Sequence, residues 1–86
     1  MRVDKFLQVS RLVRRRAVAT RLCDAGRVTL NGRPVKAASP VHVGDVLGVA
    51  FGARRLAVRV LQVPEGRPTA QPAYEVLDDR RMPDVW

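Results

Sequence analysis

The spacing of apolar residues changes once along this 86-residue chain, at Gly26. Before Gly26, apolar side chains recur every three or four residues, as they do on one face of a helix. After it they alternate with polar ones over short segments bounded by glycine or proline, which is typical of strands and turns. A chain of this length holds one modest core. We therefore predict a single α+β domain, with two N-terminal helices packed on a small, mostly antiparallel sheet.

Two short helices are expected in the N-terminal part of the chain. The first starts near Val3 and continues toward Val13, with Asp4 in its first turn, where the helix dipole favours an anion. The second covers about residues 15–25 and ends at a glycine, which readily adopts the left-handed conformation. Three consecutive arginines at 14–16 therefore lie at the junction between the helices.

The dipeptide Asn31-Gly32 predicts a hairpin with a type I′ turn, because both residue types tolerate a positive φ. Pro34 restricts the strand after this turn to the edge of a sheet. Further strands are expected at 46–51, 56–61 and 74–77, with turns at 44–45 and 52–55 and a loop at 64–72. Residues 1–77 then form one domain, and 78–86 form a loosely ordered C-terminal tail.

The excess positive charge is confined to the first 36 residues. They contain ten basic residues and two acidic ones, which accounts for the whole net charge of +8, since the rest of the chain holds six of each. Charge gathered in this way is typical of a protein that binds a polyanion, and a merely solvated basic face is the alternative. The four aromatic residues are too few for a base-stacking surface, which favours recognition of structured RNA through its backbone.

Residue types that support catalysis or metal binding are scarce. The single histidine, His42, and the single cysteine, Cys23, cannot build a zinc site; we expect a partly buried structural role for the first and a small apolar one for the second. Asp78, Asp79 and Asp84 are expected to be solvated charges. No activated nucleophile or phosphate-binding glycine loop is present. We therefore expect no enzymatic activity, no cofactor and no bound metal.

The cellular context follows from what the sequence lacks. No apolar run approaches the ~20 residues that a membrane span needs. The first residues, Met-Arg-Val-Asp-Lys, lack the apolar core of a secretion signal. We expect a cytoplasmic, monomeric protein with no membrane partner.

Several segments resemble the alpha-L RNA-binding domain, a family first named for ribosomal protein S4. They are Arg2–Leu7 (RVDKFL), the arginine run from 11 to 16 with Ala17, Gly26–Lys36 (GRVTLNGRPVK) and Gly44–Leu47 (GDVL). The resemblance covers about residues 1–50, which form the expected RNA-binding core, and the ordered combination of segments is what makes it specific.

The resemblance implies a function in translation. Free-standing members of the family bind the rRNA of the large ribosomal subunit and peptidyl-tRNA when translation has stalled. The opening residues and the short tail favour the branch that stabilises peptidyl-tRNA while another factor adds alanines to the nascent chain. That alanine-tailing factor, on the same subunit, is therefore a candidate third partner.

The resemblance also implies which residues contact RNA. Arg2 and Arg16 are the strongest candidates, and Asn31 is first of all a turn residue. Asp4 is expected to be a dipole or salt-bridge partner that orients nearby cations. The full set of candidate RNA-binding residues is Arg2, Lys5, Arg11, Arg14, Arg15, Arg16, Asn31, Arg33 and Lys36.

Three alternative functions remain open at this point. One is a heat-shock relative that binds obstructed large subunits without alanine tailing. The second is a protein-interaction module whose basic face meets an acidic protein. The third is a detached RNA-binding domain of an RNA-modifying enzyme.

Overall fold

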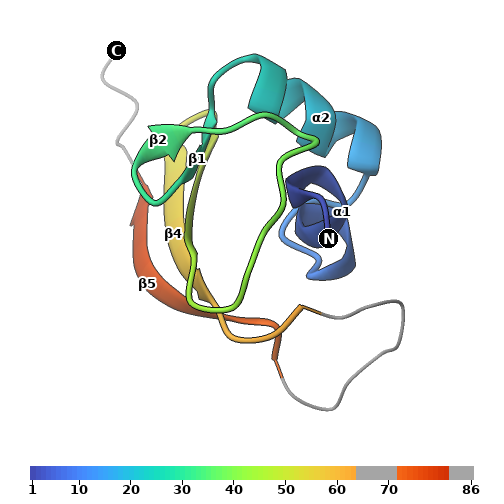
Figure 1. The fold of residues 1–86 in the computed structure, drawn as a ribbon. Helices are drawn as coiled ribbons and strands as arrows, with labels where there is room; N and C mark the ends of the chain where they lie inside the picture. Colours follow the sequence, from blue (N-terminus) through green and yellow to red (C-terminus); the bar gives the residue numbers. More distant parts are fainter. Residues whose placement is uncertain (64–71, 82–86) are drawn as a thin grey trace.

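The computed structural model describes residues 1–63 and 72–81, in which two helices lie on one face of a five-stranded antiparallel sheet (Figure 1). The strand order is β2-β1-β3-β4-β5. This architecture confirms the predicted α+β class. The helices are α1 (Val3–Val9) and α2 (Arg16–Asp24), and the strands are β1 (Val28–Leu30), β2 (Arg33–Pro34), β3 (Val46–Phe51), β4 (Arg54–Val60) and β5 (Tyr74–Arg81).

Helix α1 begins where expected but ends earlier, at Val9. Arg11 adopts a left-handed conformation with φ 65°, which turns the chain away from the helix axis. The backbone N–H of Val13 then donates to the carbonyl of Leu7 over 3.0 Å. Val13 is therefore buried as the periodicity indicated, although it lies outside the helix.

Helix α2 ends in the left-handed glycine that the sequence predicts. Gly26 has φ 72° and its N–H donates to the carbonyl of Cys23, while the N–H of the following Arg27 donates to that of Leu22. These two hydrogen bonds form a Schellman motif, which satisfies carbonyls at the helix end. The buried residues of α2 are Ala19 and Cys23, whereas Val18 is exposed.

The hairpin between β1 and β2 has the predicted turn, because φ is 52° at Asn31 and 85° at Gly32. Strand β2 lies at the edge of the sheet, as Pro34 requires. The Asn31 side chain also holds the turn against the start of β3. Its Nδ2 donates to Oδ1 of Asp45 (3.1 Å), and its Oδ1 accepts the backbone N–H of Val46 (2.9 Å).

The C-terminal strands are longer than predicted. Strand β4 starts at Arg54, so the preceding turn contains only residues 52–53, and β5 continues to Arg81. The prediction of a loose tail from residue 78 is wrong for 78–81, because Asp79 pairs with Leu56 in the ladder and its carboxylate accepts two hydrogen bonds from Arg54. The predicted loop at 64–72, apart from its last residue, and the tail from 82 onward lie outside the described residues.

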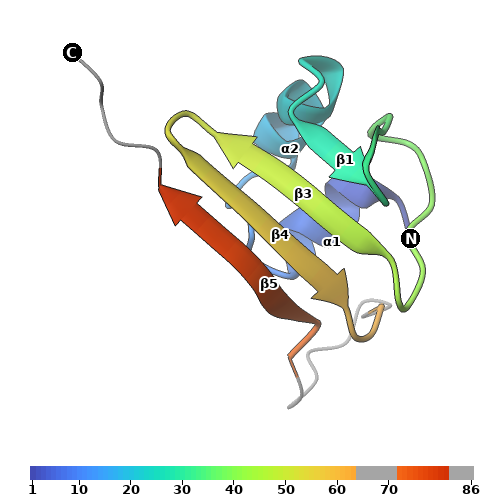
Figure 2. The same ribbon diagram turned by 90° about the vertical axis from the view of Figure 1, so that its left-hand side faces the viewer.

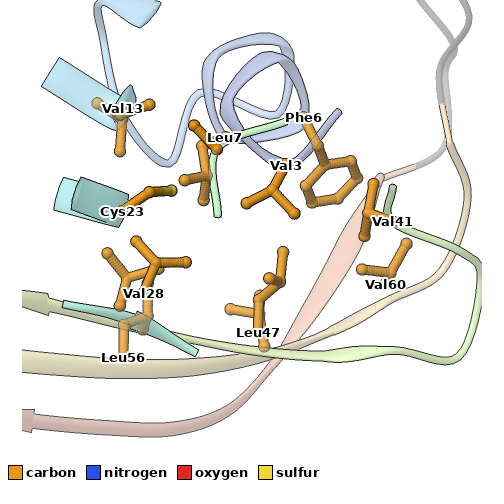
Figure 3. Close-up of a cluster of buried hydrophobic side chains, with 14 residues drawn as sticks. Val3, Phe6, Leu7, Val13, Cys23, Val28, Val41, Leu47, Leu56 and Val60 are labelled. Atoms are coloured by element: carbon orange, nitrogen blue, oxygen red, sulfur yellow. The ribbon is translucent and has the colours of Figure 1, made fainter. Parts of the chain in front are cut away.

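The core lies between the helices and the sheet (Figure 3). Helix α1 contributes Val3, Phe6 and Leu7, whose spacing places them on one helix face. Alternate strand residues such as Leu47 and Val58 are fully buried beneath them. The opposite face of the sheet carries no helix, as Figure 2 shows.

We predict that Asn31→Ala lowers the free energy of unfolding by about 1–3 kcal/mol. The substitution removes both side-chain hydrogen bonds and places alanine at a positive φ. Urea unfolding at neutral pH measures the change. The nearby Lys36→Ala is the control, since Lys36 is exposed outside the strands, and an equal loss in both variants would contradict the predicted role of Asn31.

Candidate nucleic-acid interface

The start of α1 is held by the connection between β2 and β3. The backbone N–H of Val3 donates to the carbonyl of Ser39 (2.9 Å), and that of Asp4 donates to the carbonyl of Ala37 (3.2 Å). These first N–H groups have no partner within the helix. The connection satisfies them, and it brings the backbone next to Lys36 close to the start of α1.

The side chain of Asp4 is the one charged group that the described residues bury, with 2% of the residue exposed. Its carboxylate accepts two hydrogen bonds from Arg2, from Nε to Oδ1 and from a terminal nitrogen to Oδ2, both 3.1 Å long. Nε of Arg16 lies 3.3 Å from Oδ2. The backbone N–H of Lys5 donates to Oδ1 (2.8 Å), and the hydroxyl of Thr20 lies 3.3 Å from Oδ2.

This arrangement holds two arginines from different elements around one carboxylate. A buried carboxylate without partners would be strongly unfavourable, so the contacts with Arg2 and Arg16 stabilise the packing of α1 against α2. The side chains of Arg2 and Arg16 are still 51% and 44% exposed. Each guanidinium group therefore has N–H groups left for an external anion.

The protonation of Asp4 reflects the same contacts. Burial by itself raises the pKa of this carboxyl. The hydrogen bonds from Arg16 and from the N–H of Lys5, with the positive charges of Arg16 and Arg2, outweigh burial and hold the pKa below its ordinary value. Asp4 is therefore ionised at neutral pH and keeps both arginines in place.

The predicted arginine junction lies beside this carboxylate. Arg15 is the N-cap residue of α2 and Arg16 is its first residue, while Arg14 precedes them and is exposed. Lys5 is exposed on α1, directly after Asp4. The starts of the two helices thus bring Arg2 and Arg16 together, with the other cations adjacent in the chain.

Three of the predicted site residues lie elsewhere. Arg11 follows the far end of α1, about 10 Å along the helix, where it lines a hollow with Phe51 and Tyr74. Asn31 and Arg33 belong to the β1–β2 hairpin, which Figure 1 shows apart from the helices. The amide of Asn31 already binds Asp45 and Val46, and Arg33 is exposed on the edge strand.

One participant was absent from the predicted set. Thr20 lies one helical turn after Arg16, which places both residues on the same face of α2. Its hydroxyl also lies 3.0 Å from the backbone carbonyl of Arg16. The spacing of four residues indicates that Thr20 lies beside Arg16, but only the structure shows that Asp4 faces Thr20.

The histidine and the cysteine occupy different environments. The side chain of His42 is 74% exposed, so the expectation that it is partly buried is wrong. Cys23 is buried as expected, and burial, with the negative charges of Asp4 and Asp24, raises the pKa of its thiol. Across residues 1–63 and 72–81, no three potential metal-ligating side chains come together, and neither helix is long and apolar enough to cross a membrane.

Comparison with known proteins shows the family to which this chain belongs. The S4 domain family matches residues 1–47. Relatives named RQC P-site tRNA stabilizing factor are 44% identical over 78 residues in Halalkalibacterium halodurans and 39% identical over 84 residues in Bacillus subtilis. These matches cover 88% and 95% of this chain, and 89% and 98% of the relatives. The chain therefore belongs to the S4-domain family, in the group of the RQC P-site tRNA stabilizing factors.

The heat-shock branch is also related. A heat shock protein 15 homolog of Aeromonas salmonicida is 37% identical over 78 residues, which cover 87% of this chain but 59% of that protein. The trimeric structure of heat shock protein 15 from Vibrio cholerae superimposes with a TM-score of 0.79 at 24% identity, covering 88% of this chain and 80% of the other. This likeness confirms the fold.

We predict that the folded protein loses stability at acidic pH because Asp4 becomes protonated. Folding lowers the pKa of Asp4, so the stabilisation that its ionised carboxylate provides is fully present above the ordinary pKa of 3.8. It is lost as the pH falls through the lowered pKa of the folded state. Urea unfolding of the protein and of Asp4→Asn at about pH 6 and about pH 2.5 measures this. The gap in stability between the two should be about 1–3 kcal/mol at the higher pH and should narrow at the lower one.

We also predict that Asp4→Asn weakens binding to RNA, although it removes a negative charge from a basic surface. The amide attracts Arg2 and Arg16 less strongly, so both side chains become more mobile. Filter binding to rRNA at fixed salt measures the effect, with Asp24→Asn on α2 as the charge-matched control. Tighter binding by Asp4→Asn than by Asp24→Asn would contradict a positioning role.

Proposed function

We propose that this protein docks on the large ribosomal subunit and stabilises P-site peptidyl-tRNA during ribosome-associated quality control. The observation that carries the proposal is the pair of half-exposed arginines, Arg2 and Arg16, held by buried Asp4. The pair lies in a domain whose relatives are named for P-site tRNA stabilisation.

The proposed mechanism is electrostatic docking of preformed cations onto folded RNA. Phosphates attract the guanidinium groups, and each neutralised phosphate releases counterions. Since Asp4 already restricts Arg2 and Arg16, less side-chain entropy is lost on binding than for free arginines. The guanidinium fork can also contact two phosphate oxygens at once.

Holding rRNA and tRNA together would keep the peptidyl-tRNA in the P site while alanines are added to the nascent chain. In this proposal the protein acts as a monomer in the cytoplasm, beside the alanine-tailing factor on the same subunit. It binds without performing a reaction. That view is supported by the chemistry of the site, where the lowered pKa of Asp4 keeps its carboxylate ionised and bound to Arg2 and Arg16.

A heat-shock function is the second candidate, because the fold matches heat shock protein 15 closely. Isolation of the protein from cells separates the two functions. Recovery of large subunits that carry peptidyl-tRNA together with the alanine-tailing factor supports the quality-control function. Recovery of obstructed subunits without that factor supports the heat-shock function.

We predict that Arg2→Ala and Arg16→Ala each weaken binding to large subunits about tenfold without unfolding the domain. Both substitutions remove a guanidinium group held by Asp4. Sedimentation with purified large subunits measures binding, and circular dichroism checks the fold. Arg21→Ala is the matched control, since Arg21 is exposed on α2, the helix of Arg16, and carries the same charge.

The same experiment tests the nature of the partner. If about six cations contact phosphates, binding should fall about 10³-fold between 50 and 200 mM salt. Association that survives both salt and ribonuclease treatment would instead indicate a protein partner. Equal binding by Arg16→Ala and Arg21→Ala would remove Arg16 from the interface.

A further inference from the structure

The face of the sheet that carries no helix presents a transverse row of arginines. Figure 2 looks onto this face, with α1 and α2 behind the strands. Arg55 of β4 lies opposite Ala50 of β3 on one side and opposite Arg80 of β5 on the other. Arg27, just before β1, accepts the N–H of Ala50 at its carbonyl (2.9 Å) and extends the row.

The direction of these side chains follows from the alternation along each strand. The neighbouring residues Val49 and Leu56 are buried in the core, so Ala50 and Arg55 point to the uncovered face. In a cross-strand pair both side chains lie on the same face, which places Arg80 there too.

A shallow hollow of about 440 Å³ lies beside the row. Its floor includes the small residues Gly48 and Ala57, which lie directly opposite each other in the ladder. Arg27 and Arg55 both line it, and so does Asp78, whose carboxylate forms an ion pair with Arg80. The side chain of Thr29 lies over Gly48, so the close approach to the sheet is at Ala57, and the two arginines lie where they can reach a ligand there.

The charges of this row are incompletely neutralised. Arg80 forms an ion pair with Asp78 (2.9 Å), and farther along the sheet Arg59 pairs with Glu75 (3.0 Å). In the part of the chain that the structure describes, no acidic group lies within ion-pair distance of Arg27 or Arg55. Arg55 and Arg80, moreover, are like charges directly opposite each other, which is unfavourable for the sheet on its own.

We propose that Arg27 and Arg55 form a second RNA-binding surface that contacts the phosphate backbone of a structured RNA segment. A bound polyanion would relieve the repulsion across β4 and β5 while contacting the unpaired arginines. None of the described residues that line the hollow is aromatic, which favours backbone contact over base stacking. The inference rests on the proposed function and deepens it: the domain would contact RNA on two faces, through the helix starts and through the bare side of the sheet.

Substitutions on β4 test this surface. Arg55→Thr and Arg59→Thr remove the same charge from the same strand and face, but only Arg55 belongs to the row. Arg27→Gln is a second variant outside the strands. Binding of each variant is measured with a short RNA duplex and with purified large subunits over a range of salt concentrations, and melting temperatures are measured in parallel.

We expect Arg55→Thr and Arg27→Gln to bind the duplex about fivefold to tenfold more weakly, with the salt slope reduced by about 1 for each. Arg59→Thr should change binding less. The melting temperature of Arg55→Thr should stay level or rise, because a like-charge contact is lost. Should that variant melt lower, Arg27→Gln alone decides the outcome.

Two results would overturn the proposal. One is equal weakening by Arg55→Thr and Arg59→Thr, which would show an effect of net charge only. The other is duplex binding unchanged in both Arg27→Gln and Arg55→Thr; if subunit binding still falls, the occupant of the surface is a protein. Failure of the unaltered protein to bind large subunits would count against the proposed function instead, and the duplex measurements would still test the second surface.

Discussion

The buried carboxylate of Asp4 is the contact on which the cationic surface depends. An ionised group removed from water must be compensated, and here Arg2, Arg16 and the N–H of Lys5 compensate it. Those partners come from the residue before α1, the start of α2 and α1 itself. One side chain therefore both joins the helices and sets the positions of the two arginines that best fit an anion.

Helix α1 has seven residues and is too short to be stable alone. It depends on the burial of Val3, Phe6 and Leu7 and on the backbone contacts that residues 37–39 make with its start. Arg2 is thus attached to the core through this short helix, and Asp4 on the same helix holds Arg16 of α2. Their geometry is a property of the whole domain, and a change in the core would alter the proposed RNA-binding surface as well.

The sheet separates two electrostatic environments. On one side the helices cover the core and gather cations around Asp4, and on the other side Arg27, just before β1, and Arg55 of β4 are exposed. The C-terminal half sums to zero charge, yet acids that the structure describes there form specific pairs, such as Asp79 with Arg54. A segment with zero net charge can therefore still carry a local excess of positive charge, because the strand register decides which charged residues lie together.

Local sequence chemistry was enough to determine the fold class, the type I′ turn at Asn31-Gly32, the edge position of Pro34 and the glycine end of α2. Each of these depends on the conformational preference of one or two residues. The family resemblance added the helix-start arginines, and packing explains why Arg2 and Arg16 belong together.

Tertiary structure alone decided which charges meet. The sequence indicated that Asp4 would orient a cation, but only the contact of α1 with α2 shows that it holds Arg16 and Thr20 as well as Arg2. The left-handed turn at Arg11 carries that residue away from the others. The length of β5 depends on its pairing with β4, whose residues are distant in the sequence. Such contacts join residues distant in sequence, whereas local patterns report on neighbours only.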